Sequence, residues 1–194
     1  MSSSRTELGR DLARIAVFAA LIVVLGTVTV PLPGGVPITA QTLGVMLAGT
    51  VLGPRWAPLA VLVVLVLSAI GLPVLAGGRG GLGVFAGPTA GYLLGWVVGS
   101  IVIGLIVHSS RITWWRTAVG TVVGGILIVY AFGIPVQALV LGIDLVPTLL
   151  SSFVFLPGDL LKAAAATALT LALLRAYPPA FGRRPAGAVR ARAA

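Results

Sequence analysis

Long apolar runs recur along the whole chain, and clusters of Gly, Pro and Arg interrupt them at intervals of about 20 residues. A helix of about 20 residues rises about 30 Å, which matches the hydrocarbon thickness of a bilayer. Only 9% of the 194 residues are charged, whereas soluble domains carry about 25%. The sequence therefore predicts an all-α, polytopic membrane protein.

Six segments of the chain fit membrane spans. They cover residues 12–30, 38–52, 56–70, 90–107, 117–132 and 151–174. The first run follows three Arg residues, as in a secretory signal, but no small-residue cleavage pattern comes after it, so we interpret it as the first span. We expect a bundle of six transmembrane helices over residues 1–176, and a basic cytoplasmic tail without fixed structure over residues 177–194.

The segment between the fifth and sixth spans is apolar but interrupted. Residues 133–150 contain Pro135, Gly142, Asp144 and Pro147. Helix breakers at this density favour a short interfacial helix over a seventh span.

The basic residues are distributed unevenly between the two ends of these spans. Eleven Arg residues lie on the side that carries both termini, and only Arg79 and Lys162 lie on the other side. Because Lys and Arg concentrate on the cytoplasmic side of membrane proteins, both termini are predicted to be cytoplasmic. The net charge of +9 could also suit nucleic acid, but Arg beside apolar runs is typical of contacts with lipid headgroups. No nucleic-acid partner is therefore expected.

The second and third spans are short, at about 15 residues each, and would rise only about 22 Å. The helix breakers nearest the outer side are residues 31–37, 71–88 and 157–158. Irregular backbone at membrane depth is tolerated where it lines a cavity, and shortened, interrupted spans are typical of transporter binding sites. We predict one outward-facing cavity roofed by loops. The alternative is that these segments are ordinary exposed loops.

Two oppositely charged residues open the last span. Asp159 and Lys162 are three residues apart, so they share one face of a helix. Each costs about 2.5 to 3.5 kcal/mol near the bilayer centre, so both must face protein or water. Pairing with each other relieves much of this cost and leaves acceptors and donors for a polar ligand. The alternative is a structural ion pair, with Lys162 reaching toward the interface.

Other residues of the outer half are candidate ligand contacts. Gln41 offers a donor and an acceptor, suited to an amide-like or ureido group, although such a residue commonly forms an interhelical hydrogen bond. The Gly-rich segment 77–83 can bring backbone groups close to a ligand, and Arg79 at its centre either faces a carboxylate or points to solvent. Tyr92 and Trp96 form either an aromatic wall or part of the interfacial aromatic belt.

The sequence offers no set of catalytic or metal-binding groups. His108 is the only His, and most of the bilayer is expected to separate it from Asp159. The chain also has no Cys and no Walker motif, so any ATP-driven step must belong to a partner. Ala16 and Ala20, one turn apart, permit close packing within the protein or against a partner's helix.

Three motifs, taken in this order, resemble those of one protein family. They are Val-Pro-Ile-Thr-Ala-Gln-Thr-Leu-Gly-Val-Met-Leu-Ala-Gly at residues 36–49, the segment around Gly-Gly-Arg-Gly-Gly at residues 71–95, and Leu-Pro-Gly-Asp-Leu-Leu-Lys at residues 156–162. The combination resembles BioY proteins, the biotin-specific S components of energy-coupling factor (ECF) transporters. The resemblance covers the chain apart from its two Arg-rich tails.

The resemblance implies a function and a set of partners. We expect a prokaryotic plasma-membrane protein that captures biotin from outside under a lid formed by the loop between the first two helices. Delivery would require a transmembrane coupling subunit and two cytoplasmic ATPase subunits, and no cofactor is expected. An S component for another vitamin is the alternative; a membrane-embedded enzyme or scaffold is a more distant one.

The resemblance also suggests site residues. The expected biotin-binding residues are Thr39, Gln41, Arg79, Gly80, Phe85, Tyr92, Asp159 and Lys162. The expected contacts with the coupling subunit are Ala16 and Ala20. One position departs from the family pattern, because the centre of the Gly-Gly-x-Gly-Gly motif can be small or an amide in relatives. Here it is Arg79, which could supply a cation for the biotin carboxylate.

Overall fold

The computed structural model describes residues 2–30 and 36–181, and these residues are mostly helical. The α-helices are α1 (Ser2–Leu25), α2 (Gln41–Ala69), α3 (Ala90–His108), α4 (Trp114–Val122), α5 (Val129–Leu141), α6 (Leu145–Ser152) and α7 (Leu156–Ala176). Short helical turns are η1 (Ala76–Gly78), η2 (Leu82–Phe85), η4 (Phe153–Phe155) and η5 (Pro178–Ala180), while η3 (Val123–Ile128) is a π-helix. The prediction of an all-α class is confirmed apart from one small hairpin.

That hairpin lies between the first two helices. Strands β1 (Thr29–Val30) and β2 (Ile38–Thr39) are antiparallel, with Thr29 opposite Thr39. The first helix therefore ends at Leu25, earlier than the predicted boundary at residue 30. Most of the predicted lid, residues 31–35, lies outside the described residues, as do residues 182–194 of the predicted tail.

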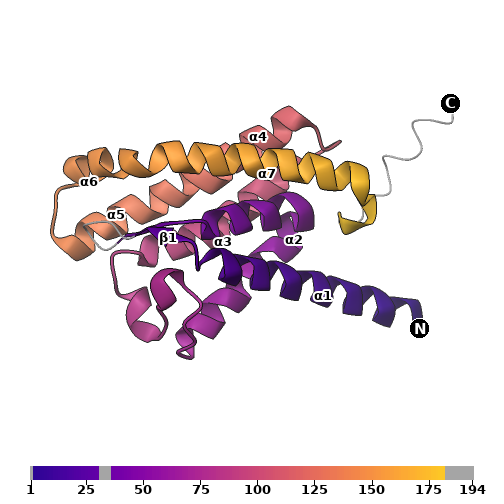
Figure 1. Ribbon diagram of the computed structural model, residues 1–194, viewed down its shortest axis with the longest axis horizontal. Coiled ribbons are helices and arrows are strands. Elements are labelled where there is room, and N and C mark those ends of the chain that lie inside the picture. Colours follow the sequence, from indigo (N-terminus) through magenta and orange to yellow (C-terminus); the bar gives the residue numbers. More distant parts are fainter. Residues whose placement is uncertain (1, 31–35, 182–194) are drawn as a thin grey trace.

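Helix α2 is two arms joined at Gly53. The Gly53 backbone has φ 77° and ψ −178°, which is not helical. Gln41 is the first residue of α2, and Val74 lies shortly after its last residue. The Gln41 side chain nevertheless donates a hydrogen bond to the Val74 carbonyl at 3.0 Å. A straight helix of 29 residues would separate these ends by about 43 Å. The chain must therefore reverse at Gly53, as Figure 1 shows, and the arms correspond to the predicted second and third segments.

The reversal at Gly53 leaves a backbone carbonyl that another helix satisfies. Pro54 has no N–H, so it cannot bond the carbonyl of Thr50, four residues earlier. His108, at the end of α3, places its Nε2 atom 2.9 Å from that oxygen. The Thr50 hydroxyl lies 2.8 Å from the Thr170 hydroxyl of α7. Three helices are thus joined at this end of the molecule.

The fifth helical segment is longer than predicted. It continues from α4 through η3 into α5 and ends at Leu141, although Pro135 lies within it. The prediction of a short interfacial helix over residues 133–150 is therefore wrong for its first half. A single Pro is tolerated in a membrane helix because neighbours can satisfy the freed backbone group. The helix ends where Gly142 adopts a left-handed conformation, with φ 65°.

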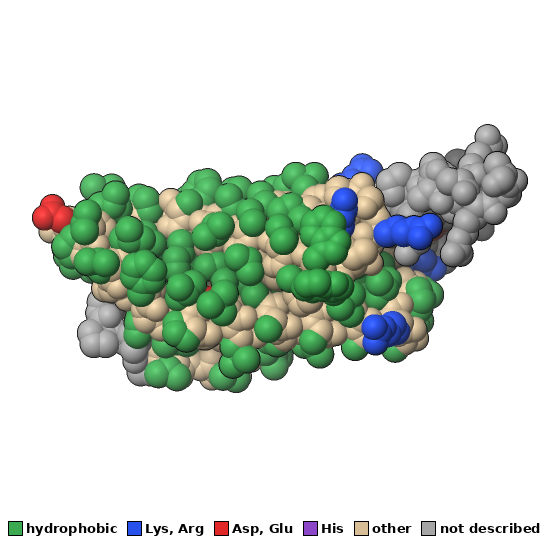
Figure 2. All heavy atoms as spheres, turned by 90° about the horizontal axis from the view of Figure 1, so that it is seen from above, with side chains coloured by type: hydrophobic (Ala, Val, Ile, Leu, Met, Phe, Trp, Pro, Cys, Tyr) green, Lys and Arg blue, Asp and Glu red, His purple; other side chains and the backbone are tan. Residues whose placement is uncertain are grey.

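The exterior is that of a membrane protein. Figure 2 shows hydrophobic side chains over most of the visible face, with Lys and Arg gathered at one end and an acidic side chain at the other. Four helical stretches of the described residues are long and apolar enough to cross a bilayer: Gln41–Ala69, Ala90–His108, Trp114–Leu141 and Leu145–Ala176. Helix α1 begins and α7 ends at the same end of the molecule (Figure 1), where Arg14 donates to the Pro179 carbonyl.

Candidate functional site

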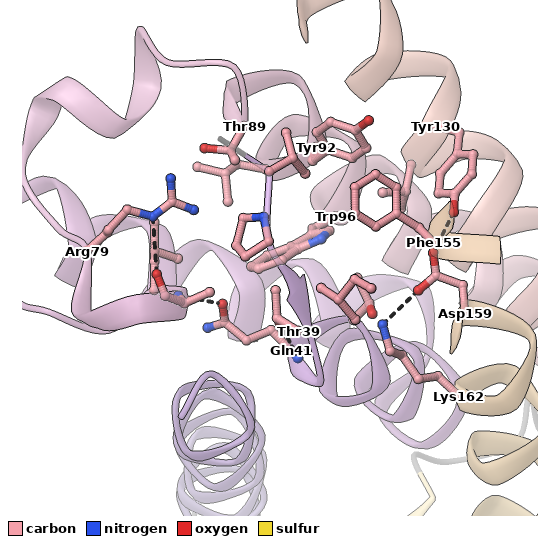
Figure 3. A pocket seen from close by; sticks show the side chains of 18 residues that line it. Thr39, Gln41, Arg79, Thr89, Tyr92, Trp96, Tyr130, Phe155, Asp159 and Lys162 are labelled. Carbon is pink, nitrogen blue, oxygen red and sulfur yellow. Dashed lines mark hydrogen bonds and ion pairs between the residues drawn. The ribbon is translucent and has the colours of Figure 1, made fainter. Parts of the chain in front are cut away.

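A cavity lies at the end of the bundle opposite the start of α1, and it joins all three sequence motifs (Figure 3). Its walls come from β2, the start of α2, the loop after α2, and helices α3, α5 and α7. The residues that line it are Val36, Pro37, Ile38, Thr39, Gln41, Thr42, Leu75, Ala76, Arg79, Thr89, Tyr92, Leu93, Trp96, Val129, Tyr130, Phe155, Asp159 and Lys162. The prediction that distant loop segments meet at one cavity is confirmed.

Asp159 is the centre of the polar wall. Its Oδ1 accepts a hydrogen bond from the Lys162 ammonium at 2.7 Å, and its Oδ2 accepts one from the Tyr130 hydroxyl at 2.7 Å. Asp159 is 6% exposed, in the first turn of α7, where the helix dipole favours a negative charge. The predicted pairing of Asp159 with Lys162 is confirmed. The buried carboxylate is stabilised on both of its oxygens.

The polar wall retains hydrogen-bonding capacity. An ionised carboxylate has about four acceptor sites, and the protein occupies two of those on Asp159. The Lys162 ammonium has three N–H donors and directs one of them to Asp159. Free acceptor and donor positions therefore lie side by side at the cavity wall. This arrangement suits a ligand that carries an N–H donor next to a carbonyl acceptor.

Aromatic rings form the apolar part of the cavity. The rings of Tyr92 and Tyr130 meet edge to face, with centroids 6.5 Å apart and planes at 80°. The Tyr92 hydroxyl donates to Gln137 Oε1 at 2.7 Å, so only its ring is offered to the cavity. Trp96 and Phe155 complete the apolar lining. The rings provide flat apolar surface beside the polar wall.

The wall opposite Asp159 carries a cation. Arg79 lies across the cavity from Asp159 and Lys162 in Figure 3, and its Nε donates to the Ala76 carbonyl at 3.1 Å. In the ranges 2–30 and 36–181, no Asp or Glu forms a salt bridge with Arg79. The backbones of Leu75 and Arg79 bond each other in both directions, which holds the loop in a narrow turn. The terminal guanidinium nitrogens remain available for an anionic group.

Six of the eight predicted binding residues line the cavity. They are Thr39, Gln41, Arg79, Tyr92, Asp159 and Lys162. Gly80 and Phe85 do not line it. The Gly80 Cα packs against the backbone of Leu72, where a side chain would clash, and Phe85 lies in η2 with 37% of its surface exposed. Gly80 therefore supports the shape of the loop, and neither residue contributes to the surface of the cavity.

Sequence reasoning missed two residues of the polar and aromatic walls. Tyr130 carries the hydroxyl bound to Asp159, and Phe155 directly precedes α7. The available signal for Tyr130 was a hydroxyl-bearing ring within an otherwise apolar span, although its partner was not visible in the sequence. Ala16 and Ala20 are exposed on the outer face of α1 and lie outside the cavity.

The fold and the cavity together define a membrane-embedded helical protein that binds a small amphipathic molecule. In the part of the chain that the structure describes, no group of three or more His, Cys, Asp or Glu side chains could hold a metal ion. Comparison with known proteins then gives the family. The chain belongs to the BioY family, whose model matches residues 1–179.

Named relatives cover nearly the whole chain. A biotin transporter BioY of Rhodobacter capsulatus is 50% identical over 182 residues, which is 88% of this chain and 95% of that protein. A biotin transporter BioY of Rhizobium etli is 48% identical over 179 residues, covering 87% and 95%. The relatives are transporters, not enzymes.

A solved structure has the same fold. It is the crystal structure of the S-component for biotin from an ECF-type ABC transporter, with a TM-score of 0.81 and 32% sequence identity. The similarity covers 88% of this chain and 93% of that one. The cavity described above therefore lies within a fold already known for a transporter subunit.

Proposed function

We propose that this protein is the biotin-binding S component of an ECF-type ABC importer. The proposal is supported by membership of the BioY family and by the fold shared with an S-component for biotin. The observation that carries it is the cavity, where the ion pair of the buried Asp159 with Lys162 faces aromatic rings and a cation. Each of these three features matches one chemical part of biotin.

Biotin has a ureido group, an apolar bicycle and a carboxylate at the end of a chain. The ureido N–H groups would donate to the free acceptor sites of Asp159, and the ureido oxygen would accept from Lys162. The bicycle would pack on the Tyr92 and Trp96 rings. The carboxylate would reach Arg79 on the opposite wall, where a bidentate contact is possible.

The membrane arrangement that we propose has six spans with both termini in the cytoplasm. The spans are α1, the two arms of α2, α3, the continuous helix from α4 to α5, and α7. It is supported by the reversal at Gly53 and by the Arg residues gathered at the end where α1 begins. The cavity then opens on the outer side.

The chain has no Cys, so single Cys variants can test this orientation cleanly. Leu82 in η2 and Ser109 after α3 are both exposed. We expect an impermeant thiol reagent to label Leu82→Cys on intact cells and Ser109→Cys only after permeabilisation. The opposite pattern would reverse the proposed orientation.

Transport requires partners that this chain does not contain. With no Walker motif in the sequence, ATP hydrolysis would belong to two cytoplasmic ATPase subunits, bound through a transmembrane coupling subunit. Ala16 and Ala20 offer a small-residue strip on the exposed face of α1, which permits close approach of another helix. We expect Ala16→Leu to weaken copurification of the coupling subunit without changing biotin affinity.

The direct test is equilibrium binding of biotin to the purified, detergent-solubilised protein, measured by calorimetry and by Trp fluorescence. Saturable binding at one site, with no binding of thiamine or riboflavin, would support the proposal. Binding of a different vitamin at the same cavity would assign another S component. Absence of any vitamin binding by the folded protein would refute the proposal.

A further inference from the structure

The Gln41 side chain lines the cavity but is already occupied by the protein. Its Nε2 donates to the Val74 carbonyl at 3.0 Å and to the Ile22 carbonyl at 3.3 Å. Its Oε1 accepts from the Ala76 N–H at 3.0 Å. A side-chain amide has two N–H donors and two acceptor sites, so only one acceptor site remains. Because Gln41 is 1% exposed, it has little freedom to turn toward a ligand.

Gly26 provides the space that this amide occupies. A Cβ atom built on Gly26 would lie 2.7 Å from Gln41 Nε2 and 2.8 Å from Gln41 Cδ. These distances are too short for carbon against either atom, so any larger residue would displace the amide. Gly26 directly follows α1 and does not line the cavity. It can influence a ligand only through its neighbours.

The partners of Gln41 lie on separate parts of the molecule. Ile22 belongs to α1, whereas Val74 and Ala76 belong to the loop after α2. The Ala76 carbonyl in turn accepts from Arg79, which supplies the cation on the wall opposite Asp159. The Gln41 backbone N–H also donates to the Thr39 hydroxyl at the end of β2 at 2.8 Å. One residue thus connects α1, the β1–β2 hairpin and the loop that carries Arg79 (Figure 3).

We infer that Gln41 is a positioning residue that strengthens biotin binding without touching biotin, by fixing the Arg79 loop against α1. This inference rests on the proposed function and differs from a direct contact between Gln41 and the ureido group. A contact in which Gln41 donates would require a free N–H on the amide, and both donors are directed to backbone carbonyls. The one remaining acceptor site belongs to a side chain that is only 1% exposed. If Gln41 has this positioning role, a side chain at Gly26 and the loss of the Gln41 amide should weaken biotin binding through the same lost contacts.

Paired variants test this expectation. Gln41→Met keeps the side-chain length but removes all three hydrogen bonds of the side-chain amide. Gly26→Ala lies outside the cavity and displaces the Gln41 amide by steric contact. We expect each change to weaken biotin binding about tenfold, because buried backbone groups lose their partners. The double variant should bind within about twofold of the weaker single variant, since neighbours that act through one contact are not additive.

Gly9→Ala is the matched control. Gly9 lies on α1, and a Cβ there would meet no atom within 4 Å. We expect its biotin affinity to be unchanged. If Gly26→Ala binds biotin like the unsubstituted protein, or if the effects of Gly26→Ala and Gln41→Met simply multiply, the positioning role is wrong.

Hydrogen exchange of the unsubstituted protein gives a second test that does not depend on how the variants fold. The Ala76 amide should be protected without ligand, because its acceptor is Gln41 rather than biotin. The protection should persist when biotin is added. Rapid exchange at Ala76 without biotin, or a loss of protection on binding, would contradict the inference. If the unsubstituted protein bound no biotin, the proposed function would fail, while the protection at Ala76 would still report on the Gln41 contacts.

Discussion

On one wall of the cavity, Asp159 and Lys162 keep hydrogen-bonding positions open, whereas on the opposite wall the Gln41 amide has both donors directed to backbone carbonyls. All three residues are polar and line the same cavity. Their expected roles differ because their protein partners differ in number and kind. A polar residue in a cavity can therefore be a ligand contact or a structural tie, and its unoccupied donors and acceptors distinguish the two.

The largest effect is expected at the polar wall, which contains Asp159 and Lys162. Asp159→Asn keeps the size of the side chain but removes the negative charge that Lys162 and Tyr130 bind. We expect biotin affinity to fall at least about 100-fold, since charge-assisted hydrogen bonds are lost and the Lys162 charge is left unpaired. Calorimetry would measure the biotin affinity of each variant, and Asp144→Asn is the control because Asp144 is exposed. Equal affinity in Asp159→Asn and the unsubstituted protein would remove Asp159 from the site.

Arg79 lies opposite the polar wall and, unlike Gln41, keeps its terminal nitrogens available for a ligand. Arg79→Gln should weaken biotin binding about thirtyfold through loss of one charge-assisted contact. Binding of the uncharged biotin methyl ester should change less than about twofold. Arg111→Gln, at an exposed position after the end of α3 and outside the cavity lining, should leave both affinities unchanged. An equal loss for biotin and its ester would mean that the carboxylate does not meet Arg79.

A smaller effect separates the two Tyr hydroxyls of the aromatic wall. Tyr130→Phe removes the donor to Asp159 and should weaken biotin binding about fivefold. Tyr92→Phe removes the donor to Gln137 outside the polar wall, so it should lower thermal stability but change biotin affinity less than about twofold. Binding titrations and melting curves of the two variants would provide the comparison. A larger affinity loss in Tyr92→Phe would reverse the assigned roles.

The smallest effect on binding is expected at the reversal of α2, remote from both walls. His108→Leu leaves the Thr50 carbonyl without its partner and should lower the free energy of unfolding by about 1 to 3 kcal/mol. Biotin affinity should stay within about twofold, because none of these residues lines the cavity. His108→Gln, which retains a donor, should recover part of the stability. Equal stability of the Leu and Gln variants would show that the bond to Thr50 contributes little.

The sequence predicted the features that arise from short spacings. Asp159 and Lys162 lie one helical turn apart, so their pairing followed from helix geometry alone. The chain reversal near Gly53 was likewise predicted, because Gly and Pro occur together between two apolar runs.

Predictions failed where distant helices meet. Gly80 and Phe85 do not line the cavity, which the glycine pattern could not indicate. Pro135 did not end its helix, because the surrounding bundle tolerates one missing hydrogen bond. The role inferred for Gln41 depends on Ile22 and Val74, which are far from it in sequence.

By itself, the sequence determined the membrane class, the approximate position of most helices, and the local pairing of Asp159 with Lys162. Hydropathy and helical periodicity are properties of neighbouring residues, so they can be recognised without a fold. Only the tertiary structure decided that Tyr130 would complete the polar wall, that Arg79 would lie opposite it, and that Gln41 would be enclosed by backbone. These contacts join residues that are remote in sequence, and helix packing alone brings them within hydrogen-bonding distance.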